Sequence, residues 1–247
     1  MTAFDAAMAK RTMNLYGKNP VRERLTADPS SIRKIFLQDN FNDPEVIKLI
    51  KEKNIPCETI SEKQINNIKR ADRVQGIVAV VDEFNYAPFD DLLTEEKKRT
   101  LILLDRINDP HNLGVMIRTA ACFGGFAIVI PEYQACGVTD TVLHVASGGD
   151  NYVPVVKVNN LARVLDQAKE AGYWIAGAVA GESASIHDFK FSFPLAMVLG
   201  SEGEGIRYGI DKHLDFKVHI PMPGAALSFN VNIACAIMCY EVARQRK

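Results

Sequence analysis

The sequence has few cysteines and histidines and no long apolar run, and each shortage excludes a class of protein. Its five cysteines are odd in number and form no Cys-x-x-Cys pair, which argues against a disulfide framework and a zinc knuckle. The five histidines lack the spacing of metal ligands, so we expect no metal. No apolar stretch has the length of a membrane span, and the N-terminus lacks the apolar core of a secretory signal. These shortages predict a cytoplasmic protein without a membrane partner.

Net charge is also low, at -1, although nucleic-acid binding depends on local patches and not on the total. Two segments of the N-terminal part are basic. Their residues are Lys10, Arg11, Lys18, Arg22, Arg24, Arg33 and Lys34, followed by Lys63, Lys69, Arg70 and Arg73. A solvated surface and an RNA-binding face are both compatible with this pattern.

Apolar patterning divides the chain, whose 247 residues suffice for one large domain or for two modules. Strands are predicted at 32–37, 57–60 and 77–81 and a helix at 43–53, which together make a small α/β module. A polar stretch without a convincing core face follows it. The predicted organisation is a flexible N-terminus at 1–13, the small module at 14–82, a linker at 83–99 and a larger domain at 100–247.

The larger domain alternates apolar strands with helices, which predicts a mainly parallel sheet covered on both faces. The strands are predicted at 101–104, 127–130, 173–179, 195–199 and 216–220, and the helices at 113–123, 161–171 and 231–246. In open α/β sheets, ligands bind at the carboxyl ends of the strands. Residues near those ends are therefore the candidates for a site.

Three segments in this domain join loop-forming residues to side chains able to bind a charged substrate. They are DPHNLGVMIRTA at 109–120, VLGSEGEGI at 198–206 and IPMPGAALSFNVN at 220–232. The glycines of the second segment, taken alone, favour a structural turn. The first strand-to-helix junction lacks the glycine-rich fingerprint of a dinucleotide-dependent oxidoreductase, which argues against that class.

Several polar residues in these segments have a structural interpretation beside a functional one. Asn112, Ser228 and Asn230 each precede or open a predicted helix and suit an N-cap. Arg118 falls among apolar helix residues, where a charge needs a partner. That partner is a carboxylate such as Glu202 or, functionally, a substrate phosphate.

Together and in this order, the segments resemble the three motifs of the SpoU family of S-adenosylmethionine-dependent RNA ribose 2'-O-methyltransferases. The first resembles Asn-x-Gly-x-x-x-Arg at Asn112, Gly114 and Arg118, and the second resembles Gly-Ser-Glu-Gly-x-Gly at 200–205. The third resembles Ser-Leu-Asn-Val-Ser, with Phe229 in place of Leu and Asn232 in place of the second Ser. The resemblance covers residues 100–247.

The resemblance implies a SPOUT-type parallel-sheet α/β domain whose C-terminus threads a trefoil knot, an exception to the general absence of knots. It also implies a homodimer. The small module, with YGKNP at 16–20 and VQGI at 74–77, resembles a ribosomal-protein-like RNA-binding domain. That domain is attached to the SpoU subgroup that includes the bacterial 23S rRNA guanosine 2'-O-methyltransferase.

The family pattern further implies the roles of individual residues. The implied catalytic residues are Asn112, Arg118, Glu202, Ser228 and Asn230. The implied contacts to S-adenosylmethionine come from Leu199, Gly200, Gly205, Ile220 and Phe229. The family's arginine is often assigned as the base, but a guanidinium with a pKa above about 12 is better suited to stabilising the developing alkoxide.

The sequence thus predicts an enzyme that methylates a ribose 2'-hydroxyl in structured RNA, with a guanosine of 23S rRNA as the expected target. Ribose methylation of tRNA is an alternative that shares the catalytic domain. A noncatalytic RNA-binding or ribosome-assembly protein is a third, against which the retained motif residues count. The final helix is apolar over a wide arc, which fits burial against a second subunit or within one chain.

Overall fold

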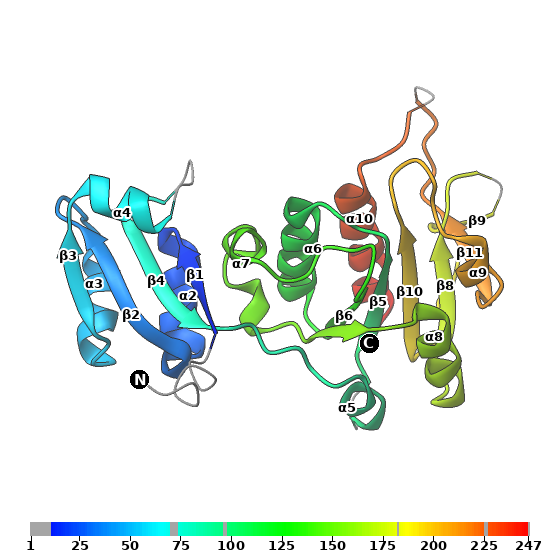
Figure 1. Cartoon of the computed structure of the whole chain (residues 1–247). Coiled ribbons are helices and arrows are strands. Elements are labelled where there is room, and N and C mark those ends of the chain that lie inside the picture. Colours follow the sequence, from blue (N-terminus) through cyan, green and yellow to red (C-terminus); the bar gives the residue numbers. More distant parts are fainter. Residues whose placement is uncertain (1–10, 70–73, 96–97, 182, 225–226, 247) are drawn as a thin grey trace. The chain divides into compact units, whose positions relative to one another are not determined.

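The computed structural model describes residues 11–69, 74–95, 98–181, 183–224 and 227–246. Contacts between residues divide the chain into two compact units. The N-terminal unit comprises Met1–Asn85 with Val138–Asn151, and the C-terminal unit comprises Tyr86–Gly137 with Tyr152–Lys247. Each unit is built on one sheet (Figure 1). Within the part of the chain that the structure describes, no helix combines the length and apolar character that a membrane crossing needs.

The N-terminal unit has a four-stranded sheet in the order β1 (Thr12–Tyr16), β4 (Ile77–Asp82), β2 (Ile32–Gln38) and β3 (Cys57–Ile60). β4 runs antiparallel to β1 and β2, whereas β2 and β3 are parallel. The helices among the described residues of this unit are α2 (Lys18–Ala27), α3 (Pro44–Glu52), α4 (Glu62–Ile68) and α7 (Asp140–Ala146), with short 3-10 turns at Pro29–Ser31 and Gly149–Asn151.

The residues at the N-terminus of α3, a helix that the apolar pattern predicted, determine where it begins. The Asp43 carboxylate accepts a hydrogen bond from Val46 N at 3.2 Å, and Pro44 occupies the first turn, where its missing N–H costs nothing. Val46 and Ile50 then face the core. The three predicted strands of this module are confirmed as well, within one residue at each end. The predicted flexible N-terminus is wrong at its C-terminal end, because β1 begins at Thr12.

Residues 138–151 belong to the N-terminal unit by their contacts, although they follow β6 in the chain. The Asp140 carboxylate of α7 accepts from Asn14 N at 3.1 Å and from Lys69 Nζ at 2.8 Å. The His144 ring stacks on Tyr16, with the ring centroids 4.2 Å apart. Tertiary contacts therefore build this unit from two separate stretches of chain.

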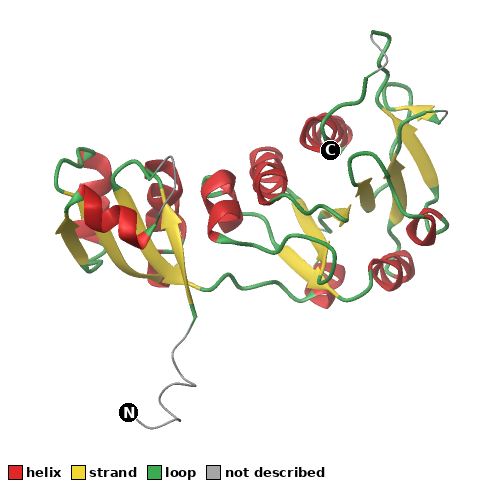
Figure 2. Ribbon diagram, turned by 45° about the horizontal axis from the view of Figure 1, so that its top comes forward, coloured by secondary structure: helices red, strands yellow, loops and turns green. Residues whose placement is uncertain are grey.

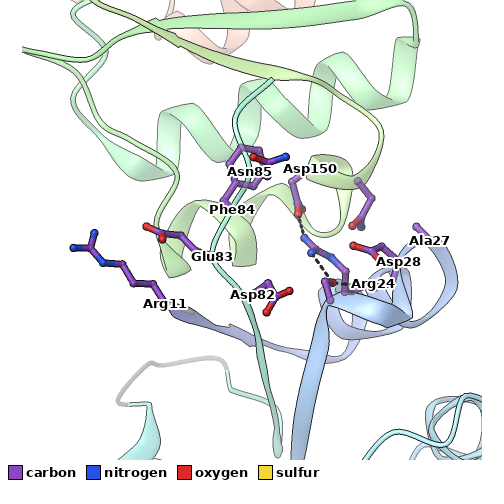
Figure 3. A pocket seen from close by; sticks show the side chains of 11 residues that line it. Arg11, Arg24, Ala27, Asp28, Asp82, Glu83, Phe84, Asn85 and Asp150 are labelled. Carbon is purple, nitrogen blue, oxygen red and sulfur yellow. Dashed lines mark hydrogen bonds and ion pairs between the residues drawn. The ribbon is translucent and has the colours of Figure 1, made fainter. Parts of the chain in front are cut away.

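A buried ion pair joins the same stretch to α2. Arg24 is only 8% exposed, and its Nη2 lies 2.5 Å from Asp150 Oδ2 while its Nη1 donates to Ser31 Oγ (Figure 3). Burial raises the pKa of Asp150, and the charge of Arg24 opposes that rise. Arg24 is thus a structural cation and not part of the predicted basic surface.

The rest of that basic surface is only partly available. Lys69 is committed to Asp140, whereas Lys18 and Arg22 remain at least partly exposed. The predicted residues Lys10, Arg70 and Arg73 lie outside the described residues.

The described part of the C-terminal unit contains a seven-stranded sheet, and all of its strand pairs are parallel. Their order is β7 (Val155–Val158), β6 (Phe126–Pro131), β5 (Thr100–Asp105), β10 (Leu195–Gly200), β8 (Trp174–Ala178), β11 (Phe216–His219) and β9 (Ala184–Ser185). The five strands predicted for this domain are confirmed, and the parallel sheet with them. β7 and the two-residue β9 were not predicted.

Helices cover both faces of this sheet (Figures 1 and 2). α5 (Phe89–Thr94), α8 (Leu161–Glu170) and α9 (Tyr208–Asp211) share one apolar cluster with the central strands. α6 (Pro110–Phe123) and α10 (Val231–Gln245) pack side by side on the other face. The expectation of a polar segment at 83–99 without a core face is wrong, because α5 buries Phe89 and Leu92.

Candidate active site

The carboxyl ends of two central strands lie next to each other at the candidate site. In the parallel pairing of β5 and β10, Gly200 stands opposite Asp105. The chain leaves β5 toward α6 and leaves β10 into the glycine-rich loop 201–207. It leaves β11 through residues 220–230 into α10. The three motif segments therefore all follow strand ends, as open α/β sheets require of a ligand site.

Gly200 is needed because the loop folds back on it. A Cβ atom placed at Gly200 would lie 2.1 Å from the carbonyl carbon of Gly205, a distance that no side chain tolerates. Gly205 N donates to Ser201 O at 3.0 Å and closes the turn. Gly203 and Gly205 have φ values of 90° and 65°, where glycine avoids strain, and a Cβ at either position would meet open space. The loop is therefore a structural turn, and its backbone at Gly203 and Gly205 is exposed and not covered by side chains.

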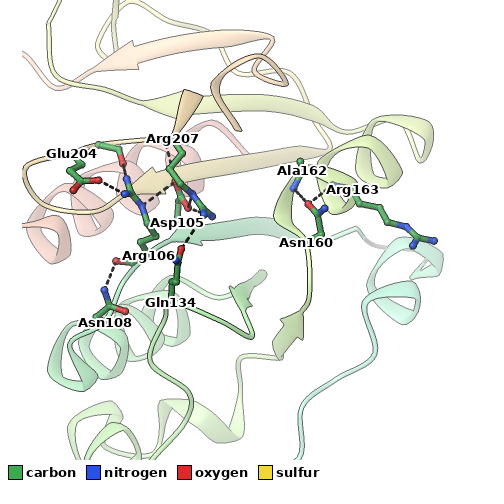
Figure 4. A network of polar contacts seen from close by, with 10 residues as sticks. Asp105, Arg106, Asn108, Gln134, Asn160, Ala162, Arg163, Glu204 and Arg207 are labelled. Atoms are coloured by element: carbon green, nitrogen blue, oxygen red, sulfur yellow. Dashed lines mark hydrogen bonds and ion pairs between the residues drawn. The ribbon is translucent and has the colours of Figure 1, made fainter. Parts of the chain in front are cut away.

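Asp105 braces this loop from the adjacent strand (Figure 4). The residue is fully buried, and its carboxylate accepts from Arg207 N at 2.9 Å and from Arg207 Nε at 2.8 Å. The neighbouring Arg106 pairs with the Glu204 carboxylate and donates to Gly205 O at 3.3 Å. The second half of the turn, from Glu204 to Arg207, is thus tied to the end of β5.

Sequence reasoning did not find Asp105 as part of the site. The signal in the sequence is a carboxylate that directly follows the apolar run 101–104 of a buried strand, which is a position where a charge requires partners. The partners themselves depend on the pairing of β5 with β10.

A second set of contacts ties the glycine-rich loop to the start of α10. Asn230 Nδ2 donates to Glu202 Oε1 at 2.6 Å, and Asn230 Oδ1 accepts from Asn232 N at 2.9 Å. Asn230 is therefore the N-cap that the sequence predicted. The Glu202 carboxylate lies at a helix N-terminus, where the helix dipole favours negative charge.

A third contact connects the first and last motif segments. Asn232 Nδ2 donates to Asn112 Oδ1 at 2.6 Å. The expectation that Asn112 caps α6 is wrong, because Asp109 is the cap and accepts from His111 N. Ser228 is exposed and does not cap α10, whose cap is Asn230. The Asn112 side chain is thereby free to point toward α10 and join the site.

Arg118 lies on the outer side of α6 and is exposed. Its neighbours Met116 and Ile117 are fully buried against the sheet, so the apolar stretch around Arg118 does not enclose its charge. Among the described residues it makes no hydrogen bond or ion pair, and the expected pairing with Glu202 is not formed. Glu202 binds Asn230 instead. The guanidinium is consequently available to an external anion.

The residues expected to hold S-adenosylmethionine divide into two groups. Leu199, Gly200 and Gly205 come together at the end of β10, with Leu199 buried and Gly205 exposed. Ile220 and Phe229 lie on the segment between β11 and α10, where Phe229 is 41% exposed. Bare glycine backbone and apolar side chains are the kinds of group that line sites for an adenosine-bearing donor. Among the described residues, no three His, Cys, Asp or Glu side chains gather as a metal would require.

Family comparisons match both units of the chain. The model of the SpoU rRNA methylase family matches residues 99–240, and the model for RNA 2'-O ribose methyltransferase substrate binding matches residues 15–87. The chain belongs to the SpoU rRNA methylase family. The reaction of this SpoU family is methyl transfer from S-adenosylmethionine to a ribose 2'-hydroxyl, and the chain is an RNA methyltransferase of that kind.

Relatives of this SpoU methyltransferase extend over its whole length. A Staphylococcus haemolyticus protein assigned to the TrmH family of tRNA/rRNA methyltransferases is 34% identical, over 94% of this chain and 95% of that protein. The SpoU methyltransferase AviRb from Streptomyces viridochromogenes, solved with AdoMet, has a TM-score of 0.80 at 22% identity, covering 99% of this chain and 94% of its own. An rRNA methyltransferase from Sinorhizobium meliloti has a TM-score of 0.79 at 24% identity, and the match covers 96% of this chain and 88% of that protein's chain. These structural likenesses support the fold.

Proposed function

We propose that this SpoU enzyme methylates the ribose 2'-hydroxyl of one guanosine in 23S rRNA. The observation that carries the proposal is the linked pair of contacts between Glu202 and Asn230 and between Asn232 and Asn112. These bonds connect all three motif segments at the carboxyl edge of one sheet. The N-terminal unit, which matches a substrate-binding module of RNA ribose methyltransferases, favours rRNA over tRNA as the substrate.

Positioning is the main contribution that the protein makes to this reaction. S-adenosylmethionine supplies the methyl group on a sulfonium, which is already an activated leaving group. Leu199 and Gly200 would hold it from the end of β10, Gly205 from the loop that follows, and Ile220 and Phe229 from the segment before α10. Holding reactants in a fixed geometry can lower a barrier by on the order of 7–11 kcal/mol. The bracing of the loop by Asp105 and Arg106 serves this requirement.

Arg118 is the residue proposed to act on the RNA. Its exposed guanidinium suits the phosphate beside the target ribose and the negative charge that develops on the 2'-oxygen. It remains protonated, because a guanidinium has a pKa above about 12. Asn112, Glu202, Ser228 and Asn230 would orient the target nucleotide from the linked segments.

Each part of the chain has its own task in this reaction. Residues 14–82 select the RNA, and residues 83–99 link them to the catalytic domain. Residues 100–247 bind the methyl donor and carry out the transfer. The enzyme acts as a homodimer, in the cytoplasm, where its RNA substrate is found.

Methyl transfer to purified RNA tests the proposal. The full chain is incubated with radiolabelled S-adenosylmethionine and with either 23S rRNA or tRNA from cells that lack the protein, and modified riboses are mapped. A single labelled ribose in 23S rRNA is expected. Label in tRNA alone would redirect the assignment to tRNA. RNA binding without any transfer would support a noncatalytic ribosome-assembly protein.

A further inference from the structure

Two cavities in the N-terminal unit differ in the charge of their linings. One, of about 580 Å³, contains the carboxylates of Asp28, Asp82, Glu83 and Asp150 beside two arginines (Figure 3). The other, of about 400 Å³, contains a single carboxylate, that of Glu62, together with Lys18. Most of its remaining polar lining consists of carboxamides, from Gln38, Asn40, Asn42, Asn66 and Gln75. The second cavity, called the amide pocket below, is the one that a polyanion can approach.

The amide pocket is assembled from elements that are far apart in sequence. Gln38 ends β2, Asn42 lies before α3, Asn66 stands on α4, and Gln75 precedes β4. Gly76 forms part of its floor, because a Cβ placed there would lie 3.3 Å from Gln38 Cβ and 3.4 Å from Phe41 Cδ2. The fold of the unit therefore brings the carboxamides to one end of the sheet.

The carboxamides have unused hydrogen-bonding capacity. Among the described residues, the side chains of Gln38, Asn40, Asn42 and Asn66 make no hydrogen bond. Gln75 uses only its carbonyl oxygen, which accepts from Lys18 N at 2.9 Å. A carboxamide presents both donors and an acceptor, which complement the mixed edge of a nucleobase. Proteins read RNA sequence largely through such contacts to unpaired bases.

Lys18 supplies a fixed positive charge at the amide pocket. Its Nζ donates to Asn42 O at 3.3 Å and lies 5.2 Å from the centre of the Phe41 ring. The ammonium forms no ion pair within the described residues, so it can meet a phosphate. The half-buried Phe41 ring provides apolar surface beside the carboxamides.

We propose that the amide pocket binds an unpaired nucleobase of the substrate RNA. The carboxamides contact the edge of the base, Glu62 accepts from a base amino or imino group, and Lys18 contacts the adjoining phosphate. This inference rests on the proposed function, since it takes an RNA as the substrate. It gives the N-terminal unit a way to choose a loop or bulge over a continuous duplex.

Fluorescence anisotropy with the full chain tests the inference. The probes are a labelled hairpin RNA with an unpaired loop and a blunt duplex with the same stem sequence. The variant Gln38→Leu with Asn66→Ala is expected to raise the hairpin Kd about tenfold, since two or more hydrogen bonds are lost, and to leave the duplex Kd unchanged. Lys18→Ala should weaken hairpin binding and reduce its salt dependence.

Matched controls lie close by in the same unit. Asn67→Ala removes an exposed carboxamide on α4 that does not line the pocket, and Lys51→Ala removes an exposed lysine of α3. Both should bind the hairpin like the wild type. Thermal melting verifies folding, and Asn66→Ala alone, at an exposed helix position, provides a variant that folds in any case.

Two results would overturn the inference. One is equal affinity of the wild type for hairpin and duplex, and the other is an unchanged hairpin Kd in the folded pocket variants. Assaying the same preparations for methyl transfer to 23S rRNA separates this inference from the proposed function. A wild type that methylates RNA while its pocket variants bind normally refutes the pocket alone. A wild type that binds the hairpin selectively but methylates no RNA refutes the function alone.

Discussion

Asp105 ends β5 and Arg118 lies on α6, the helix that follows it, and the surroundings of these two charged residues are opposite. Asp105 is fully buried and bound to Arg207, whereas Arg118 is exposed and has no partner among the described residues. A buried charge must be paired for the fold to be stable, and an exposed one need not be. The first therefore supports the site and the second is available to substrate.

Replacing Arg118 should separate chemistry from folding. Because the side chain has no partner to lose among the residues that the structure describes, Arg118→Ala is expected to keep the melting temperature of the wild type while turnover falls about a hundredfold or more. Arg118→Lys should restore little activity, since it lacks the planar guanidinium fork. Arg163→Ala, at an exposed position of α8, is the control and should remain active. Near-normal turnover in Arg118→Ala would rule out the proposed role.

Replacing Asp105 should damage both the fold and the loop. Asp105→Asn leaves Arg207 without its countercharge and is expected to lower stability by up to about 3 kcal/mol, because Arg207 keeps some contact with water. Donor affinity, measured by calorimetry below the melting transition, should fall as the glycine-rich loop loses its brace. Asp166→Asn removes only the exposed pairing with His213 and should change neither quantity measurably. Unaltered donor affinity in Asp105→Asn would show that the loop holds its shape alone.

At the scale of elements, the turn of the glycine-rich loop requires the backbone at Gly200 and the backbone at Gly205 to lie close together. Gly200→Ala would force a methyl group onto the backbone of Gly205, so the turn must open, at a cost of about 1–3 kcal/mol. Weakened donor binding is expected. Gly209→Ala, where an added Cβ meets nothing within 4 Å, should be tolerated. Equal donor affinity in the two variants would contradict the geometry of the loop.

Elements with a strong apolar pattern were predictable, whereas several short ones were not. The buried strands β5, β6 and β10 are indicated by their apolar composition, and the ten-residue helix α8 is indicated by its apolar period. α5 has six residues and two core anchors, too few to establish a period. Within the site, motifs identified Asn230 as a cap, but the bond between Asn232 and Asn112 joins residues 120 positions apart and has no local signal.

At the scale of the whole molecule, residues 138–151 belong by their contacts to the N-terminal unit, which their position in the chain did not predict. That stretch joins the N-terminal unit through Asp140, His144 and Asp150, and none of these contacts follows from local sequence. The trefoil knot likewise depends on the path of the complete chain, and it stays a prediction.

Exposed apolar side chains on α6 and α10 bear on the oligomeric state. Ile233 is 49% exposed and Tyr240 is 57% exposed, and Tyr240 packs edge-on against the partly exposed Phe123. Exposed apolar residues grouped on neighbouring elements are typical of a surface that another protein covers. The wide apolar arc of the final helix is thus only partly buried within one chain.

We expect a homodimer that uses this surface. Light scattering should give about twice the 27.3 kDa chain mass, and Ile233→Asp with Tyr240→Asp should give a monomer, because charges would be buried in the interface. Tyr208→Asp, at an aromatic residue that is 86% exposed elsewhere on the same unit, should remain dimeric. If the site is completed at the interface, the monomeric variant should lose methyl transfer while keeping its fold. A wild type that is monomeric and fully active would refute the dimer, whereas an active monomeric variant would refute only the need for the interface in catalysis.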